Sequence, residues 1–336
     1  MVINPPADFL SRGLCGKLFK LVRFRQMKIT ARIQDSTHRF FDSDIWFSFK
    51  KSRVTVIAAC VTVVFMLSAF GAPLIAPHTP FEPASLDLMD ASTPPAWFED
   101  GTTEFLLGTD DQGRDIFSTI LYGSRISIFV GFASMVLAMI IGITLGLISG
   151  YIGGAVETVI MRIADVQISF PAILIAMLIY GVALSLLPNE RHDDVATWVL
   201  ILAIGLANWV HFARTVRGST MVEKNKEYVQ AARVIGRNRA TIMFRHILPN
   251  VMGPVLVIAT IGLAIAILTE ATLSFLGVGV PPTRPSLGTL IRIGQDFLFA
   301  GEWWIVIFPG IALAVLVLAV NLLGDWMRDA FNPKLR

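Results

Sequence analysis

Residues 228–236 read Tyr-Val-Gln-Ala-Ala-Arg-Val-Ile-Gly, and residues 246–250 read His-Ile-Leu-Pro-Asn. Both stretches lie in a basic segment between two long apolar runs. A short helix that carries the small residues Ala231 and Ala232 can approach another protein closely, and Gly236 then allows the chain to turn. Pro249 suits the first turn of a following helix, where its missing N–H costs no hydrogen bond. The pattern therefore indicates a short docking helix placed just before a membrane helix.

The apolar runs define the rest of the chain. Of its 336 residues, 54% are hydrophobic and only 16% are charged, and the charges are clustered. A helix needs about 20 apolar residues to cross a bilayer, and runs of that length are too long for barrel strands. Six segments qualify, namely residues 54–76, 126–150, 166–187, 195–213, 247–275 and 303–324. We expect an all-α integral membrane protein with six transmembrane helices; a soluble protein with six buried helices is the alternative that this composition disfavours.

The distribution of Lys and Arg predicts the orientation. Eleven lie in residues 1–53, eight in residues 214–246 and only five in the segments expected on the opposite side. Both termini are therefore expected in the cytoplasm. The predicted organisation is a basic cytoplasmic tail (1–53), a first transmembrane helix (54–76), an acid-rich periplasmic loop (77–124), a five-helix core (125–324) containing a cytoplasmic loop at 214–248, and a cytoplasmic tail (325–336).

The N-terminal tail leaves three interpretations open. Its leucines recur at roughly helical spacing between basic residues, which fits an amphipathic helix on the inner leaflet. A basic tail without fixed structure, which only sets the orientation, fits equally well. Translation starting at Met27 is the third interpretation.

Several functional classes are disfavoured. The net charge of +3 follows from the topology, so we expect no nucleic-acid partner. Cys15 and Cys60 form no disulfide framework, and no metal-ligand spacing occurs. Gly16-Lys17 lacks the other residues of a phosphate-binding loop, and no nucleophile elbow is found. We expect no catalytic residue, and no metal or cofactor bound by this chain.

Polar residues within the apolar runs are candidates for function. They are Asp165, Asn208, His211, Glu270 and Asn321. A proton relay needs such groups stacked through the bilayer centre, whereas these lie towards the ends of their predicted spans. We therefore expect structural roles, with Asp165 paired to Arg162 and Asn321 donating an interhelical hydrogen bond. No residue is predicted to bind substrate.

Glycines repeat every four residues at 142, 146, 150 and 154. Such a stripe lets two helices approach closely, which is the expected role. A hinge that moves during gating is the alternative.

The segment at residues 228–250 resembles the cytoplasmic coupling motif of ABC-importer permeases, which is written Glu-Ala-Ala, three residues, Gly, nine residues, Ile-x-Leu-Pro. Gln230 stands in place of the glutamate, which removes a charge from the docking surface. Six further segments resemble motifs of the di- and oligopeptide branch of these permeases, namely residues 107–115, 122–127, 165–171, 270–277, 285–288 and 329–333. The resemblance as a whole covers about residues 54–336, which is the chain without its basic tail.

The resemblance implies a type I ABC importer permease fold in a bacterial inner membrane. It further implies a C-type subunit that pairs with a second, homologous permease, with two ATPases that carry ATP and Mg²⁺, and with a periplasmic or lipid-anchored binding protein. Such an importer takes up di- or oligopeptides by alternating access; a nickel chelate or an opine-like solute is the alternative cargo. The coupling residues implied are Glu227, Tyr228, Gln230, Ala231, Ala232, Gly236, His246, Leu248 and Pro249. The rival hypothesis is an ion- or proton-coupled secondary transporter that uses Glu270, Asp165 and His211.

Overall fold

The computed structural model describes residues 44–81, 86–188 and 192–330. The chain divides into two compact units, residues 1–56 and 57–336. The described part of the first unit consists of α2 (Asp44–Lys51) and the start of α3 (Arg53–Phe70). Our interpretations of residues 1–43 lie outside the described residues.

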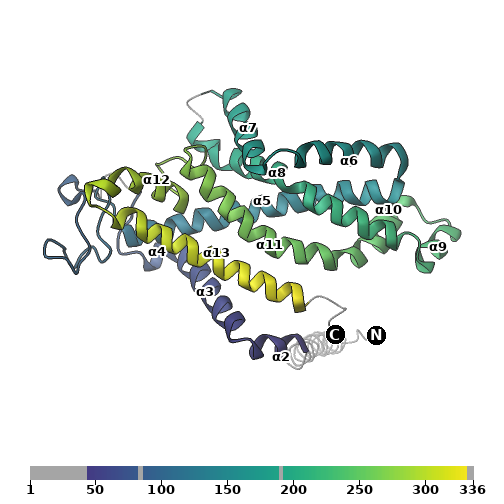
Figure 1. The fold of residues 1–336 in the computed structure, drawn as a ribbon, viewed down its shortest axis with the longest axis horizontal. Coiled ribbons are helices and arrows are strands. Elements are labelled where there is room, and N and C mark those ends of the chain that lie inside the picture. Colours follow the sequence, from purple (N-terminus) through teal and green to yellow (C-terminus); the bar gives the residue numbers. More distant parts are fainter. Residues whose placement is uncertain (1–43, 82–85, 189–191, 331–336) are drawn as a thin grey trace, which may run out of the picture. The chain divides into compact units, whose positions relative to one another are not determined.

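The second unit is built from helices, most of them joined by short turns, with a long connection between α4 and α5 (Figure 1). After α3 come α4 (Ala72–Ile75), η2 (Leu88–Asp90), α5 (Ile116–Ile152), α6 (Gly154–Ile168), α7 (Ala172–Ser185), α8 (His192–Glu223), α9 (Glu227–Val234), α10 (Arg239–Thr241), the π-helix η4 (Ile242–Ile247), α11 (Leu248–Phe275), α12 (Leu287–Phe297), η5 (Leu298–Ala300) and α13 (Trp304–Ala330). Among the residues that the structure describes, five stretches are long and apolar enough to cross a membrane, and the bent pair α6–α7 adds a sixth if it counts as one span. The prediction of an all-α membrane protein is confirmed.

The predicted span at 166–187 is not one helix. The chain bends by 99° between α6, which ends at Ile168, and α7, which begins at Ala172. Pro171 causes the break, because its ring disfavours helical geometry at the residue before it and it has no N–H to continue the helix. The 14 residues of α7 extend only about 21 Å, too short to cross a bilayer alone.

Three helices extend well beyond their predicted spans, and α13 runs to Ala330, six residues into the predicted cytoplasmic tail. α5 begins ten residues before position 126 because the Asp115 side chain accepts hydrogen bonds from the backbone N–H groups of Phe117 and Ser118. The predicted loop at 77–124 therefore ends at Asp115. α8 continues ten residues past position 213, where Arg214 and Arg217 are paired with carboxylates of α6. Hydropathy marks the part of a helix that prefers lipid, whereas the helix itself ends where its capping and pairing end.

The glycine stripe lies where α5 packs along α8. A Cβ added at Gly142 would lie 2.4 Å from an atom of α8, one at Gly146 2.5 Å and one at Gly150 2.8 Å. These three positions support the packing role. Gly154 differs, because a Cβ there would meet nothing within 4 Å, and its φ of +59° serves the turn from α5 into α6.

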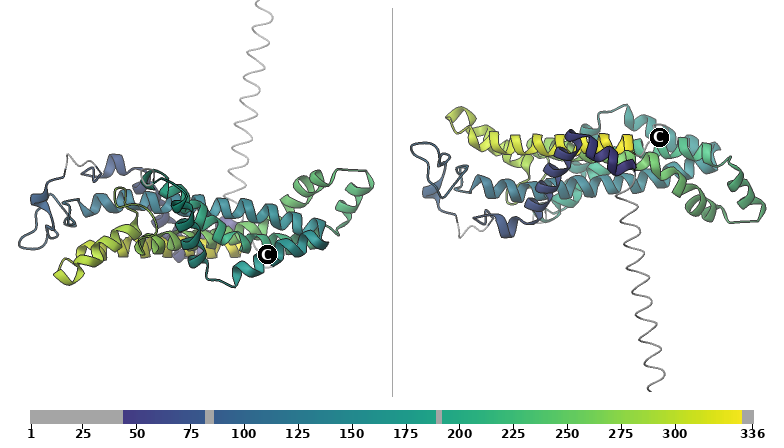
Figure 2. Two further views of the ribbon diagram at one scale, coloured as in Figure 1. Left: turned by 90° about the horizontal axis from the view of Figure 1, so that it is seen from above. Right: turned by 90° about the horizontal axis from the view of Figure 1, so that it is seen from below.

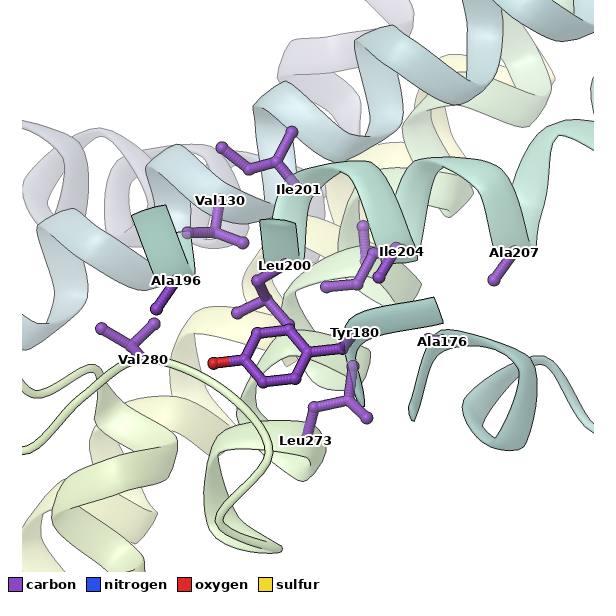
Figure 3. Packing of buried hydrophobic residues seen from close by; sticks show 12 residues of the cluster. Val130, Ala176, Tyr180, Ala196, Leu200, Ile201, Ile204, Ala207, Leu273 and Val280 are labelled. Carbon is purple, nitrogen blue, oxygen red and sulfur yellow. The ribbon is translucent and has the colours of Figure 1, made fainter. Parts of the chain in front are cut away.

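The short helix α7 packs against α8 and the end of α11 through apolar side chains. Figure 3 shows the ring of Tyr180 beside Leu200 and Leu273. The Tyr180 hydroxyl donates a hydrogen bond of 2.6 Å to the carbonyl of Gly279, in the loop after α11. This bond fixes the broken span to the end of the bundle that carries α12.

Residues 86–115 fold back onto the start of α13. Arg114 Nε lies 2.6 Å from Asp110 Oδ2, and both side chains are almost fully buried. The Trp304 indole N–H donates to the Thr109 carbonyl at 3.1 Å. Figures 1 and 2 show this segment and α9 at opposite ends of α5, α8 and α11. The two regions that the charge pattern assigns to opposite sides of the membrane are thus far apart; which side is cytoplasmic stays a prediction.

Candidate functional site

The predicted docking helix is present as α9, with eight residues between α8 and α11. Its inner face carries Val229 and Ala232, which are buried with Ile242, Ile247 and Val251. Its other face is exposed and ends in two apolar side chains, Val234 (89% exposed) and Ile235 (75% exposed). Exposed apolar side chains next to a packed inner face are typical of a surface that receives a partner.

Gly236 ends α9, as predicted, by adopting a φ of +78°. The Arg237 N–H donates to the Ala232 carbonyl at 3.1 Å, and the Gly236 N–H donates to the Arg233 carbonyl at 2.9 Å. This pair of bonds is the Schellman motif, in which the left-handed residue satisfies the last carbonyls of a helix. The turn directs the chain from α9 into α10.

Tyr228 joins α9 to both neighbouring helices. Its hydroxyl donates to Glu223 Oε2 at 2.6 Å, at the end of α8, and accepts from Asn250 Nδ2 at 3.2 Å, in the first turn of α11. Burial, and then the hydrogen bond to the Glu223 carboxylate, raise the pKa of Tyr228 to about 12. Lys226 Nζ also donates to Glu223, at 2.6 Å. These hydrogen bonds connect α9 to the end of α8 and the first turn of α11.

Pro249 lies in the first turn of α11, as predicted, but no break precedes it. α10, η4 and α11 run on as one stretch, Arg239–Phe275. The Leu248 N–H donates to the Met243 carbonyl, five residues earlier. In this wider π-turn the helix continues through Pro249, although proline has no N–H that can donate a helical hydrogen bond.

The structure brings the predicted coupling residues to one end of the bundle. Glu227, Gln230 and Ala231 are exposed on α9, and Ala232 faces inward. His246 and Leu248 are half-buried, and Pro249 is exposed at the start of α11.

Sequence reasoning missed an arginine cluster next to this site. Arg233, Arg237 and Arg239 line a cavity of ≈ 430 Å³ together with Tyr151, Ile152 and Ile242. The Arg233 guanidinium carbon lies 5.4 Å from the centre of the Tyr151 ring. The sequence signal for this cluster is the high positive charge of residues 214–246, which membrane orientation alone also explains.

Asp165 and Asn321 do not make the contacts that the sequence predicts. Asp165 pairs with Arg214 of α8, so the predicted pair with Arg162 is wrong; α6 lies beside α8, and a cross-helix partner is available. Asn321 is half-buried, and its side chain makes no hydrogen bond to another described residue. The bond that joins α11 to α13 instead runs from Thr260 Oγ1 to the Gly324 carbonyl, at 3.3 Å.

Glu270 is fully buried near the outer end of α11. Its Oε1 accepts from the Ser274 hydroxyl at 2.8 Å, and the hydroxyls of Ser127 and Ser286 face the same carboxyl group. Its carboxyl group thus lies between α5, α11 and the start of α12, and its Oε2 has no hydrogen-bond partner among the described residues. In the part of the chain that the structure describes, no group of three His, Cys, Asp or Glu side chains is arranged to hold a metal ion.

Comparison with known proteins identifies the family. Residues 142–336 match the family described as "Binding-protein-dependent transport system inner membrane component", and residues 41–95 match the "N-terminal TM domain of oligopeptide transport permease C". The dipeptide transport system permease protein DppC of Haemophilus influenzae is 41% identical over 293 residues, which are 87% of this chain and 95% of that protein. The oligopeptide transport system permease protein OppC of Bacillus subtilis is 36% identical over 296 residues, which are 87% of this chain and 90% of that protein.

Among solved structures, the MetNI methionine ABC transporter in an inward-facing conformation is similar, with 17% identity and a TM-score of 0.49 over 64% of this chain and 96% of that chain. The sequence matches carry the assignment. The chain belongs to the family of binding-protein-dependent transport system inner membrane components, as a multi-pass, non-catalytic permease of a bacterial ABC importer.

Proposed function

We propose that this chain is the permease subunit of an importer for di- or oligopeptides, and that α9 is the helix through which separate ATPases drive it. The names of the relatives, dipeptide and oligopeptide transport permeases, support the cargo. One observation carries the coupling: α9 is bonded to α8 and α11 through Tyr228 while its outer face stays open.

The mechanism follows from the stiffness of this connection. An ATPase that closes on ATP displaces the helix docked in it, and the bonds of Tyr228 transmit the displacement to α8 and α11. Alternating access requires that each nucleotide state of the ATPase contacts α9 with a different free energy, because equal contacts shift no equilibrium.

The residues divide into three roles. Glu227, Gln230 and Ala231 form the exposed surface that meets the ATPase, and the neutral Gln230 makes this contact depend on shape more than on charge. Ala232 seats α9 on the bundle, and Gly236 sets its end. His246, Leu248 and Pro249 lie where η4 continues into the first turn of α11.

The assembly we propose contains a second, homologous permease, two ATPases that hold ATP and Mg²⁺, and a periplasmic or lipid-anchored binding protein. This chain binds neither nucleotide nor metal in the proposal. The description of the family as binding-protein-dependent supports the last partner.

Ala232→Asp tests the coupling role. The substitution places a carboxylate in the buried contact with Ile242 and Ile247, where an unpaired charge is strongly disfavoured. We expect the complex to assemble in the membrane but to lose ATP-driven peptide uptake. Ala240→Asp, at an exposed position of α10, is the matched control and should transport normally.

The variants are purified in mild detergent, and their companions are identified by mass spectrometry. Uptake at the parental rate by Ala232→Asp would contradict the role of α9. Recovery of the parental chain without an ATPase or a second permease would contradict the assembly.

A further inference from the structure

A polar stripe runs along α8 where an apolar surface is expected. Asn208, His211 and Thr215 stand at i, i+3 and i+7, so their side chains share one helix face. His211 is exposed, and Asn208 and Thr215 are half-buried. Asn208 Nδ2 donates to the Ile204 carbonyl at 2.9 Å, which leaves its side-chain oxygen free to accept.

This stripe lies at the middle of the bundle, not at its edge. Ser134, the nineteenth of the 37 residues of α5, lines the same cavity as Asn208 and His211. The residues opposite them on α11, from Ile258 to Ala266, occupy the middle of that helix. Polar side chains at this depth are costly in contact with lipid tails, so protein or water must cover the face.

A cavity of ≈ 400 Å³ opens on this face. α5, α8 and α11 form its walls, and Ile168, at the bend between α6 and α7, borders it. Most of the lining is apolar, with a few polar groups: Asn208, His211, Thr215 and Ser134. Ser134 is fully buried, and its hydroxyl has no hydrogen-bond partner among the described residues. A mostly apolar cavity with a few converging polar groups is typical of a ligand site.

Charge narrows the class of ligand. Arg214 is the only lysine, arginine or carboxylate residue in the lining, and it is paired with Asp165. The remaining polar groups, an amide, an imidazole and two hydroxyls, match the N–H and C=O groups of a peptide backbone. Hydrogen bonds to the peptide backbone do not depend on the side chains of the peptide. Such contacts are also weak enough for a transported peptide to dissociate from the site.

We propose that this cavity is this chain's wall of the peptide pathway, in which Asn208 and His211 contact the backbone of the passing peptide. The proposal rests on the proposed function, since it takes peptides as the cargo. The exposed polar face is then covered by water and substrate in the assembled importer, not by lipid.

Thiol accessibility tests the wall. The complex, with its binding protein, is reconstituted from a chain carrying Cys15→Ser and Cys60→Ala plus one new cysteine, either His211→Cys or Asn208→Cys. A charged methanethiosulfonate reagent that does not cross membranes is added from both sides without nucleotide. The cysteine thiolate attacks the sulfenyl sulfur, forms a mixed disulfide and releases sulfinate, a reaction that requires a hydrated thiol.

The matched control is Leu318→Cys, at the middle of α13 on a side chain that is 58% exposed. We expect both α8 cysteines to react at least about tenfold faster than the control, because only a hydrated thiol ionises readily. A mixture of alanine di-, tri- and pentapeptides should slow the α8 reactions several-fold and leave the control unchanged.

Two results would overturn the proposal. α8 cysteines that react as slowly as Leu318→Cys would mean that lipid or the second permease covers this face. Fast reactions that peptides leave unchanged would mean a hydrated cavity outside the pathway. Labelling requires no ATP, so failure of the coupling proposal would instead appear as absent ATP-driven uptake with normal labelling.

Discussion

Gly236 provides the sharpest test of α9, because its substitution changes backbone conformation and nothing else. Its φ is +78°, and a Cβ added there would meet no atom within 4 Å. A left-handed conformation costs an ordinary L-residue about 1–2 kcal/mol. That free energy lowers the population of the correctly capped α9 by about 5–30-fold. Asn tolerates this conformation best, Ala less well and the β-branched Val least.

The assay is ATP-driven uptake of labelled peptide by proteoliposomes, normalised to the amount of assembled complex. We expect the rates to fall in the order Gly236, Gly236→Asn, Gly236→Ala, Gly236→Val. Gly218→Ala is the matched control: Gly218 lies within α8, has no positive φ, and a Cβ there also meets nothing within 4 Å. Parental uptake by Gly236→Val would refute the role of this cap, and equal losses for Asn and Val would point to a contact at this position instead of its conformation.

Three further predictions concern the scaffold. Gly146→Leu should lower the thermal stability of the purified chain, since even a Cβ would lie 2.5 Å from the Ala213 carbonyl and overpacking costs about 1–3 kcal/mol; an unchanged melting temperature would contradict the packing role. Asp165→Arg should reduce the yield of folded chain in the membrane, and adding Arg214→Asp should restore it, because the pair is then re-formed with reversed charges; no recovery in the double variant would contradict the pairing. Burial, and then the charge of Asp110, raise the pKa of Asp111, so ionisation of this carboxyl disfavours the native state as pH rises through that pKa. Asp111→Asn should therefore have a higher melting temperature than the parent at neutral pH. The difference between the two melting temperatures should shrink as pH falls towards 3.8. A gap that widens on acidification would contradict this account.

Hydropathy and residue spacing located α9 and the membrane helices other than the broken pair α6–α7. The Ala-Ala-x-x-x-Gly pattern predicted both a short helix and the turn that ends it, because only glycine adopts a φ of +78° at Gly236 without strain. Pro171 also carried the information for the bend after α6, but the apolar run around it dominated the interpretation.

Other features depend on tertiary contacts and could not be read from the chain. The extension of α8 past position 213 requires carboxylates of α6 at the right height for Arg214 and Arg217. Asn208 and His211 share a cavity with residues from the middle of α5 and α11, such as Ser134 and Ile261, and this shared lining depends on how the three helices pack. The bonds of Tyr228 likewise exist only because the ends of α8 and α11 meet beside α9.

The central claim is that separate ATPases drive this permease. The most direct measurement is uptake of labelled peptide by proteoliposomes that contain the complete complex, with the binding protein and peptide outside and ATP enclosed or omitted. We predict uptake that requires enclosed ATP, stops when the ATPases cannot hydrolyse it, and continues when a protonophore removes the proton gradient. Uptake that persists without ATP and collapses with the proton gradient would contradict the account, and would favour a secondary transporter in which Glu270, Asp165 and His211 carry the proton.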